Sequence, residues 1–335
     1  MSAPCAVGII ANPASGTDIR RLVALGTVFG TQEKINIVQR ILAGLHAAEV
    51  ERFYIMPDAF HIGQRALERL PAHLAHLRGQ VTILDMAIGH EAEDSWRAAQ
   101  ELQALEVGCL VVLGGDGTNR VVAKGCGEVP ILAVSTGTNN VIPTMIEGTV
   151  AGLAAGFVAR HSPALTKVAY RAKYLEVCIE GLDPDWALVD VAVVEGTAVG
   201  SRAVWDAASV RQVILTRAEP SSTGFSSLGG LLHPISCTNP KGLALRVGKP
   251  RVGRVTAPLA PGLLASFSVE AMEEMAIGES ISVEGGAKIL ALDGEREIAL
   301  RAGRGARVTL RDEGPWFVDV RAALAQAAAQ GSFVR

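Results

Sequence analysis

Aromatic residues, cysteines and long uncharged apolar runs are all scarce in this chain, and each shortage excludes a class of protein. Phenylalanine, tryptophan and tyrosine make up 4% of the 335 residues, although 49% of the residues are hydrophobic. Much of that hydrophobic share is alanine, valine and leucine, which explains the positive mean hydropathy. No apolar run approaches the roughly 18 residues that a membrane-spanning helix needs. We therefore expect large apolar cores and no stable membrane anchor.

The cysteines are too few and too scattered for a disulfide framework or a structural zinc site. The five lie at Cys5, Cys109, Cys126, Cys178 and Cys237, without a C-x-x-C spacing. No basic residue precedes the short apolar run 5–11, so a secretory signal is not indicated. Buried thiols in a reducing compartment are the simplest explanation, and we expect a cytoplasmic protein.

An excess of charge of one sign is also lacking. Lysine and arginine number 31 against 34 aspartate and glutamate residues, a formal net charge of −3, and there is no basic stripe. Nucleic acid, which binds proteins through its phosphates, is therefore not an expected partner. A small phosphate-bearing ligand needs no basic patch, because backbone amides at the start of a helix bind anions.

The order of strand and helix patterns predicts two domains, for which a chain of 335 residues is long enough. Over 1–150, strand-like runs alternate with helical periodicity, and the run 109–113 is apolar throughout, as in a parallel strand buried on both faces. We predict an α/β domain with a parallel sheet over 1–150 and an antiparallel, β-rich domain over 151–310. The C-terminal segment, 311–335, has a strand and a helix pattern that could pack back on the first domain.

One loop gives the strongest chemical signal in the chain. A predicted buried strand leads into Gly-Gly-Asp-Gly-Thr at 114–118 and then into a predicted helix. Glycines let the backbone approach a ligand closely and adopt angles that other residues resist, and the helix start offers amides to a phosphate. A carboxylate at such a site suits metal binding or acceptance of a hydroxyl proton. The alternative is a plain strand–helix turn in which Asp116 caps the helix.

Two further loops of similar composition follow other predicted strands. One reads Asn-Pro-Ala-Ser-Gly-Thr at 12–17, and the other Ser-Thr-Gly-Thr-Asn-Asn at 135–140. In a parallel sheet all three loops emerge at the carboxyl ends of strands, where α/β folds bind ligands. None fits the phosphate-loop pattern G-x-x-x-x-G-K-[ST] or the dinucleotide pattern G-x-G-x-x-G. The three loops together favour a phosphate site of another kind.

The second domain holds two weaker signals. Residues 221–230 are dense in serine, threonine and glycine, which a flexible hairpin loop explains equally well. Asp293-Gly294-Glu295 has the composition of a common hairpin turn, the interpretation that we favour for this segment taken alone.

Taken in order along the chain, these segments resemble the NAD kinase and diacylglycerol kinase superfamily. The resemblance runs from Asn12-Pro13 through the two glycine-rich loops to Thr223-Gly224, to Gly-Gly-Leu-Leu-His-Pro at 229–234, and to the late Asp-Gly-Glu. The opening segment, 12–34, resembles one branch, the ATP-NAD kinase-like proteins called acetoin catabolism protein X.

The resemblance implies that the second domain is β-sandwich-like and binds the substrate, and that the active site lies between the two domains. Asp116 and Glu295 would be the catalytic residues. The nucleotide and its phosphates would be bound by Asn12, Gly114, Gly115, Gly117, Thr118, Asn119, Thr136, Gly137, Thr138, Asn139 and Asn140. The substrate would be bound by Asp190, Thr223, Gly224, Ser226, Ser227 and Asp293. ATP or polyphosphate would be the donor, Mg²⁺ would bridge its phosphates, and the protein would be a homo-oligomer.

Three positions depart from the NAD kinase pattern. Val189 and Leu228 stand where those enzymes have asparagine and tyrosine, and an apolar side chain cannot replace a hydrogen bond. At the third position, Glu295 matches the glutamate of lipid kinases and not the residue typical of NAD kinases. We predict an ATP-dependent kinase acting on a hydroxyl of NAD or a related small molecule. The alternatives are a lipid or polyol kinase of diacylglycerol kinase type, and a nucleotide-binding regulator with little catalysis.

Overall fold

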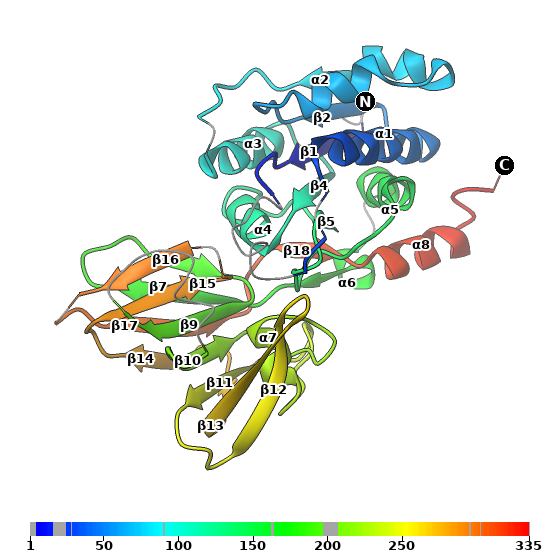
Figure 1. Ribbon diagram of the computed structural model, residues 1–335. Helices are drawn as coiled ribbons and strands as arrows, with labels where there is room; N and C mark the ends of the chain where they lie inside the picture. The colour runs from blue at the N-terminus through cyan, green and yellow to red at the C-terminus, as the bar shows by residue number, and fades with distance from the viewer. Residues whose placement is uncertain are drawn as a thin grey trace.

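The computed structural model describes residues 5–15, 25–27, 29–89, 91–161, 164–196, 207–294, 296–301 and 303–334. An α/β part is built on a mixed seven-stranded sheet, and a β part on two antiparallel sheets of seven and four strands. Figure 1 shows the α/β part above the β part, so that the two meet along one boundary. The predicted fold class, a parallel-sheet α/β domain joined to an antiparallel sandwich-like domain, is confirmed.

The α/β sheet has the strand order β3-β2-β1-β4-β5-β18-β6. Its strands are β1 (Ala6–Ala11), β2 (Arg52–Ile55), β3 (Val81–Ile83), β4 (Cys109–Gly114), β5 (Ile131–Ser135), β6 (Ala169–Arg171) and β18 (Trp316–Val318). All neighbours are parallel except β18 and β6. Because β18 comes near the end of the chain, segments on both sides of the β part contribute to this sheet.

Helices cover both faces of the α/β sheet. They are α1 (Thr31–Ala47), α2 (Ile62–Glu68), the 3₁₀ helix η2 (Ala72–Gly79), α3 (Glu93–Ala104), α4 (Asp116–Ala123), α5 (Gly148–His161), α6 (Leu165–Val168) and α8 (Val320–Ala329). One apolar core lies between the sheet and α1, α2, α5 and α8, and a second lies under α3 and α4. In β1, Ile9 belongs to the first core and Ile10 to the second, because successive strand residues point to opposite faces.

The β part has sheets of order β12-β13-β11-β10-β9-β15-β16 and β14-β17-β7-β8. Their bounds are β7 (Tyr174–Ile179), β8 (Asp185–Ala187), β9 (Asp190–Glu195), β10 (Val210–Leu215), β11 (Lys241–Val247), β12 (Gly253–Ala260), β13 (Leu263–Ala276), β14 (Ser280–Val283), β15 (Lys288–Leu292), β16 (Arg296–Leu300) and β17 (Ala306–Arg311), with the short helix α7 at Phe225–Gly230. In β9, Val191 and Val193 belong to the core between the sheets. Ala192 and Val194 belong to a core under α7, so this strand is buried on both faces.

The sequence patterns predicted neither helix α5 nor the long β12–β13 hairpin. Helix α5 is rich in alanine and glycine and is buried on several sides, so its apolar residues do not form the single stripe of a surface helix. Pro258 lies inside β12, and proline argues against a central strand. The structure resolves this conflict because β12 is the edge strand of its sheet.

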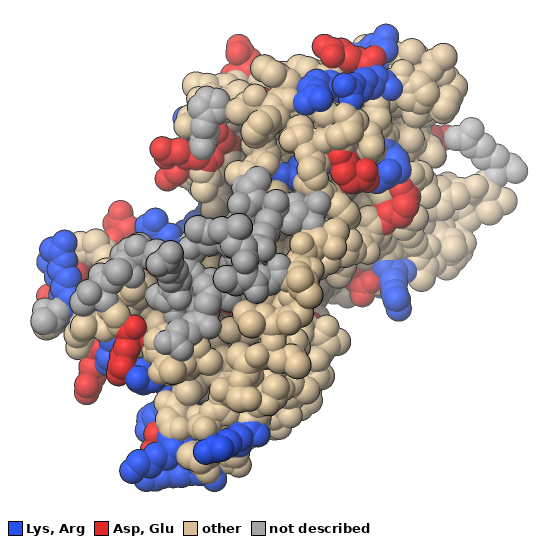
Figure 2. All heavy atoms as spheres, viewed as in Figure 1, with Lys and Arg blue, Asp and Glu red and all other residues tan. Residues whose placement is uncertain are grey.

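The visible surface carries charges of both signs, with one basic end. Figure 2 shows Lys and Arg gathered at the lower end of the molecule, where Arg246, Lys249, Arg251 and Arg254 are exposed around the turn from β11 to β12. Among the described helices, none has the length and apolar character to cross a membrane.

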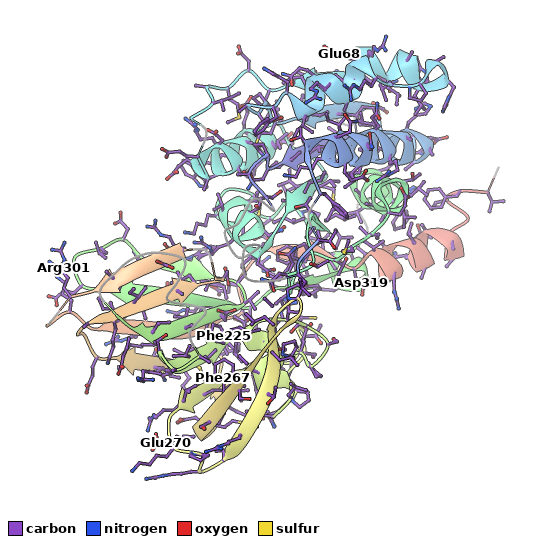
Figure 3. The ribbon with its side chains drawn as sticks, viewed as in Figure 1. Glu68, Phe225, Phe267, Glu270, Arg301 and Asp319 are labelled. Atoms are coloured by element: carbon purple, nitrogen blue, oxygen red, sulfur yellow. The ribbon has the colours of Figure 1, made fainter. Side chains whose placement is uncertain are left out.

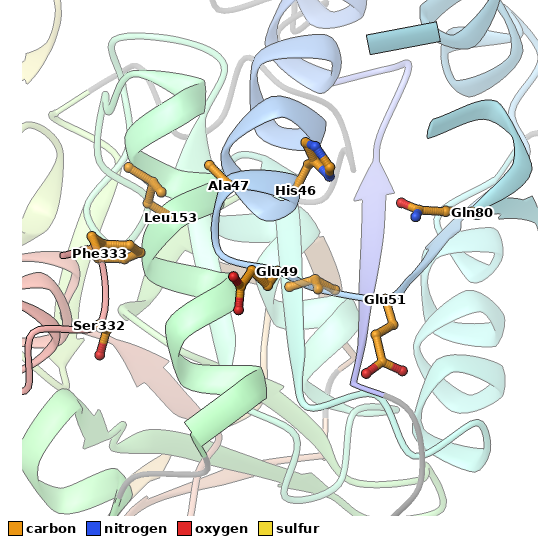
Figure 4. A pocket seen from close by; sticks show the side chains of 9 residues that line it. His46, Ala47, Glu49, Glu51, Gln80, Leu153, Ser332 and Phe333 are labelled. Carbon is orange, nitrogen blue, oxygen red and sulfur yellow. The ribbon is translucent and has the colours of Figure 1, made fainter. Parts of the chain in front are cut away.

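A hollow of about 860 Å³ lies at the amino ends of β2 and β3, lined by His46, Glu51, Gln80 and their neighbours (Figure 4). Its lining includes none of the predicted site residues. The carboxyl ends of the strands, on the opposite edge of the same sheet, are therefore the place to look for the site.

Candidate functional site

The loops after β1, β4 and β5 meet at the carboxyl edge of the α/β sheet. The backbone amide of Asn12 donates to the carbonyl oxygen of Leu113 at 3.1 Å, and Asn12 Nδ2 donates to Thr118 Oγ1 at 2.8 Å. On the other side of the first loop, Thr136 Oγ1 donates to Ser15 Oγ at 3.0 Å. Hydrogen bonds thus join the three loops into one connected surface.

Lys34, in helix α1, holds the first loop, although no motif predicted a role for it. The residue is 2% exposed. Its Nζ donates to the carbonyl oxygens of Asn12 at 2.9 Å, Pro13 at 2.9 Å and Ser15 at 2.7 Å. Three acceptors match the three N–H groups of an ammonium group, which makes burial of the charge tolerable. The sequence gives no sign of this because the acceptors are backbone atoms.

Gly114 and Gly115 shape the turn from β4 into α4. A Cβ atom at Gly114 would lie 2.5 Å from Thr118 Cβ, so only glycine lets the strand end come this close to the helix. Neither glycine has a positive φ, and Gly115, which precedes the helix, has a φ of −95°. The expectation that these glycines adopt angles other residues resist is therefore wrong; close approach is the reason for Gly114.

Asp116 is the first residue of α4 and joins this helix to the loop after β5. The backbone amide of Val141 donates to Asp116 Oδ2 at 2.9 Å, and that of Ile142 donates to Oδ1 at 2.8 Å. Hydrogen bonds to an ionised carboxylate are stronger than those between neutral groups. The residue remains 9% exposed, so its carboxylate is held in a defined orientation at the boundary of the two parts.

The serine- and threonine-rich loop of the β part contacts the α/β part directly. Thr223 Oγ1 donates to Asn139 Oδ1 at 2.8 Å, across the boundary. The next residue, Gly224, has a φ of +77°, which favours glycine at this position. Phe225 anchors the loop by packing on Phe267 of β13, with ring centroids 6.2 Å apart (Figure 3).

Asp293 organises the backbone around Asp190. Its carboxylate accepts the amides of Leu188 at 3.0 Å, Val189 at 2.8 Å and Asp190 at 3.2 Å, and its side chain is 0% exposed. Burial raises the pKa of the Asp293 carboxyl above its usual value, although Arg120 and the three amides act in the opposite direction. The side chain therefore supports the backbone at the start of β9.

Residues of both parts line one pocket at their boundary. Its walls are Asp116, Asn139, Val141, Asp190, Thr223, Gly224, Phe225, Leu259, Asp293 and Gly294. The volume of about 50 Å³ corresponds to a few water molecules. It is large enough for the reacting group of a ligand, not for a whole nucleotide. The structure thus brings Asp116 and Asn139 together with Asp190 and Thr223, which lie far apart in the sequence.

Several predicted nucleotide-binding side chains support the loops from within. Asn119 is fully buried, and its Nδ2 donates to the carbonyl oxygen of Gly115 at 2.9 Å. Asn140 Nδ2 donates to Ser135 Oγ at 2.7 Å. Thr138 Oγ1 accepts a backbone amide at 3.0 Å. In this state these three side chains hold the loops in shape, and none of them lines the pocket.

Two predicted substrate-binding serines also support the backbone. Ser226 and Ser227 are both fully buried. Ser226 Oγ donates to the carbonyl oxygen of Arg217 at 3.2 Å, and Ser227 Oγ donates to that of Gly224 at 2.7 Å. The structure does not bring either side chain to the pocket. The other predicted catalytic residue, Glu295, lies outside the described residues.

The chain matches known protein families over most of its length. Residues 7–162 match the family model of the ATP-NAD kinase N-terminal domain, and residues 173–313 match that of the acetoin catabolism protein X C-terminal domain. Among solved structures, yeast NADH kinase complexed with NADH has a TM-score of 0.55 at 13% identity, covering 98% of this chain and 87% of that chain. This likeness shows a shared fold.

A curated relative defines the family more closely. Acetoin catabolism protein X of Cupriavidus necator is 38% identical over 333 residues, covering 96% of this chain and 92% of the relative. Because the identity extends over nearly the whole of both proteins, the chain belongs to the acetoin catabolism protein X family, a branch with the NAD kinase-like fold.

Proposed function

We propose that this protein is an ATP-dependent phosphotransferase that transfers a phosphoryl group to a hydroxyl of NAD or a related small molecule. The observation that carries the proposal is the pocket at the boundary, where Asp116 at the start of α4 shares one cavity with Asp190 and Thr223 of the β part. The match to an ATP-NAD kinase domain and the fold shared with a kinase complexed with NADH support nucleotide ligands.

The glycine-rich loops of the α/β part would bind the donor. Helix α4 begins at Asp116, and the amides in the first turn of a helix face its N-terminal end, where a phosphate can bind. Thr118 Oγ1 accepts a hydrogen bond from Asn12, so its own hydroxyl hydrogen stays available for a phosphate oxygen. Polyphosphate offers the same oxygens and is the alternative donor.

Asp116 would accept the proton of the attacking hydroxyl group. The acceptor oxygen forms a bond to the γ-phosphorus while the bond from that phosphorus to the β–γ bridging oxygen breaks. The electron pair leaves with ADP, and the hydroxyl proton passes to the Asp116 carboxylate. The amides of Val141 and Ile142 hold this carboxylate in place during the transfer.

The protein groups available as metal ligands suit a magnesium ion that binds together with the nucleotide. Within the described residues, no group of three or more His, Cys, Asp or Glu side chains could hold a metal alone. Mg²⁺ commonly uses one or two protein carboxylates together with substrate phosphates, and Asp116 could supply one. Bound there, Mg²⁺ would neutralise charge on the phosphates.

The location that we expect for the protein is the cytoplasm. The free cysteines and the use of ATP as the phosphoryl donor both fit this location.

An acceptor screen tests the proposal. The purified protein is incubated with ATP, Mg²⁺ and either NAD, NADH, a small polyol or diacylglycerol, and phosphorylated products are measured by mass spectrometry. We expect NADP from NAD, and a loss of about 10²–10⁴-fold in rate for Asp116→Asn. The exposed Asp183, which is not in the pocket, provides the control Asp183→Asn, with an unchanged rate.

The Asp116→Asn rate must be measured where the variant is folded, because its amide nitrogen would face a backbone donor and lose one hydrogen bond. Circular dichroism melting provides that check. Turnover of a polyol or diacylglycerol instead of NAD would retain phosphoryl transfer and replace the acceptor. Nucleotide binding without product from any acceptor would contradict the proposal and favour a regulator.

A further inference from the structure

Helix α4 carries a buried cation one turn beyond Asp116. The side chain of Arg120 is 7% exposed and reaches the β part. Its Nη1 lies 3.4 Å from Asp185 Oδ1, and its Nε lies 3.4 Å from Asp293 Oδ2. Asp185 begins β8, and Asp293 follows β15. One side chain of the α/β part therefore meets two carboxylates across the boundary.

Asp293 connects this contact to the acceptor side of the pocket. The carboxylate that faces Arg120 also accepts the amides of Leu188, Val189 and Asp190. Asp190 and Asp293 both line the pocket. A shift of the Asp293 carboxylate would therefore move the backbone that carries Asp190.

Asp185 ties the same helix to the β part a second time. It pairs with Lys124, which follows α4, and its Oδ2 lies 3.4 Å from Arg296 Nε. Burial opposes ionisation of Asp185, but the hydrogen bond and charge of Lys124, with Arg120, lower its pKa below the usual value. Asp185 keeps other cations if Arg120 is lost, whereas the described contacts leave Asp293 only backbone donors.

The contacts of Arg120 are better suited to orienting the Asp293 carboxylate than to stabilising the fold. Its Nε is buried without a hydrogen-bond partner among the described residues, and its ion-pair distances of 3.4 Å exceed the roughly 2.7–2.9 Å of strong charge-assisted bonds. Buried ion pairs add little net stability because desolvation opposes them, but removing one partner leaves a charge uncompensated. The pairing therefore matters mainly for where Asp293 lies.

We propose that Arg120 is a positioning residue that sets the acceptor wall of the pocket, Asp190 and Asp293, relative to Asp116. This inference rests on the proposed phosphotransfer at the same site. Asp116 and Arg120 belong to one short helix. The ion pair of Arg120 with Asp293 therefore fixes the position of the acceptor wall relative to Asp116. A misplacement of about 1 Å between reacting groups can lower a rate about 10²-fold.

Hydrogen exchange tests the positioning without any need for turnover. In Arg120→Gln we expect the amides of residues 188–190 to exchange about tenfold faster than in the wild type, because Asp293 holds them. The amides of α1 should not change. Arg97→Gln is the matched control, since Arg97 pairs with Asp94 within the α/β part. Unchanged exchange at 188–190 in Arg120→Gln would overturn the inference.

Kinetics then separate positioning from general damage. We expect Arg120→Gln to bind a non-hydrolysable ATP analogue within about twofold of the wild type, because the described partners of Arg120 lie in the β part. The kcat/KM for the acceptor should fall about 10²-fold. Arg120→Lys should recover only part of this, since a single ammonium group cannot imitate the two-pronged guanidinium. Wild-type acceptor kinetics in Arg120→Gln would refute the role.

The two hypotheses fail in distinguishable ways. If the wild type phosphorylates no acceptor, the proposed function is wrong, and hydrogen exchange still decides whether Arg120 positions residues 188–190. If the wild type is active and Arg120→Gln matches it in both exchange and kinetics, only the Arg120 inference is wrong.

Discussion

At the scale of single residues, Gly114 leaves the space in which Thr118 lies, and we propose that the hydroxyl group of Thr118 binds phosphate. In Gly114→Ala, the new methyl carbon would lie 2.5 Å from Thr118 Cβ and 2.6 Å from Thr118 Oγ1. Thr118 would have to move and would lose its bond to Asn12. We expect a loss of about 1–3 kcal/mol in the free energy of unfolding, with weaker ATP binding, measured by urea denaturation and calorimetry. Gly79→Ala, whose added methyl carbon would have nothing within 4 Å, is the control and should not lower the free energy of unfolding; equal losses would refute the argument.

Residues differ in how visible their roles are in the sequence. Asp116 could be singled out because a carboxylate between glycines at a helix start calls for a chemical reason. Lys34 and Arg120 could not, since Lys34 meets backbone carbonyls and Arg120 meets carboxylates distant in sequence. Asn119 shows a structural role that the motif did not reveal, because its side chain is buried and donates to the carbonyl oxygen of Gly115.

At the scale of elements, α1 and α5 pack with their backbones nearly in contact. A Cβ atom at Gly152 would lie 2.3 Å from the carbonyl oxygen of Ile41, and one at Gly44 would lie 2.2 Å from that of Thr149. In Gly152→Ala, better helix propensity would contribute up to about 1 kcal/mol. The backbone clash should outweigh it, because overpacking costs about 1–3 kcal/mol. We expect a lower urea midpoint, whereas Gly79→Ala, in open space, should keep the wild-type midpoint. A stabilised Gly152→Ala would show that the helices can separate freely.

The elements that could be predicted best are those whose burial produces a simple pattern of apolar residues in the sequence. Strand β4 is buried along its whole length, and its uninterrupted apolar run marked it as a central parallel strand. Helix α5 was not predicted from the sequence. Its small residues allow close packing against α1, but they also remove the apolar stripe by which helices are recognised.

At the scale of the whole molecule, side-chain and backbone hydrogen bonds between distant segments join the two parts. Thr223 meets Asn139, which lies 84 residues earlier, and the amide of Leu25 donates to the carbonyl oxygen of Pro261 at the tip of the β12–β13 hairpin at 2.8 Å. The sequence predicted both kinds of sheet from local patterns. It could not predict which pairs meet across the boundary, since no local period records them.

Lys173 gives this boundary a testable pH dependence. Lys173 lies between β6 and β7 and is buried, and its Nζ donates to the carbonyl oxygens of Ser236 at 3.4 Å and Asn239 at 2.6 Å, in the segment before β11. Burial, and then the nearby charge of Arg217, lower the pKa of Lys173 from 10.5 to about 8. Between these values the unfolded chain binds more protons than the folded chain, so this residue makes stability rise with pH.

Replacing Lys173 with methionine removes that pH-dependent contribution and leaves the other titrating groups in place. The free energy of unfolding of the wild type minus that of Lys173→Met should therefore increase from about pH 8 to about pH 10.5 and be flat below pH 7. Urea denaturation at pH 7, 8.5 and 10 measures it, with Lys249→Met, an exposed lysine far from this boundary, as the matched control. A constant difference across this range would mean that Lys173 titrates alike in both states, and that the charge is not buried between the two parts of the molecule.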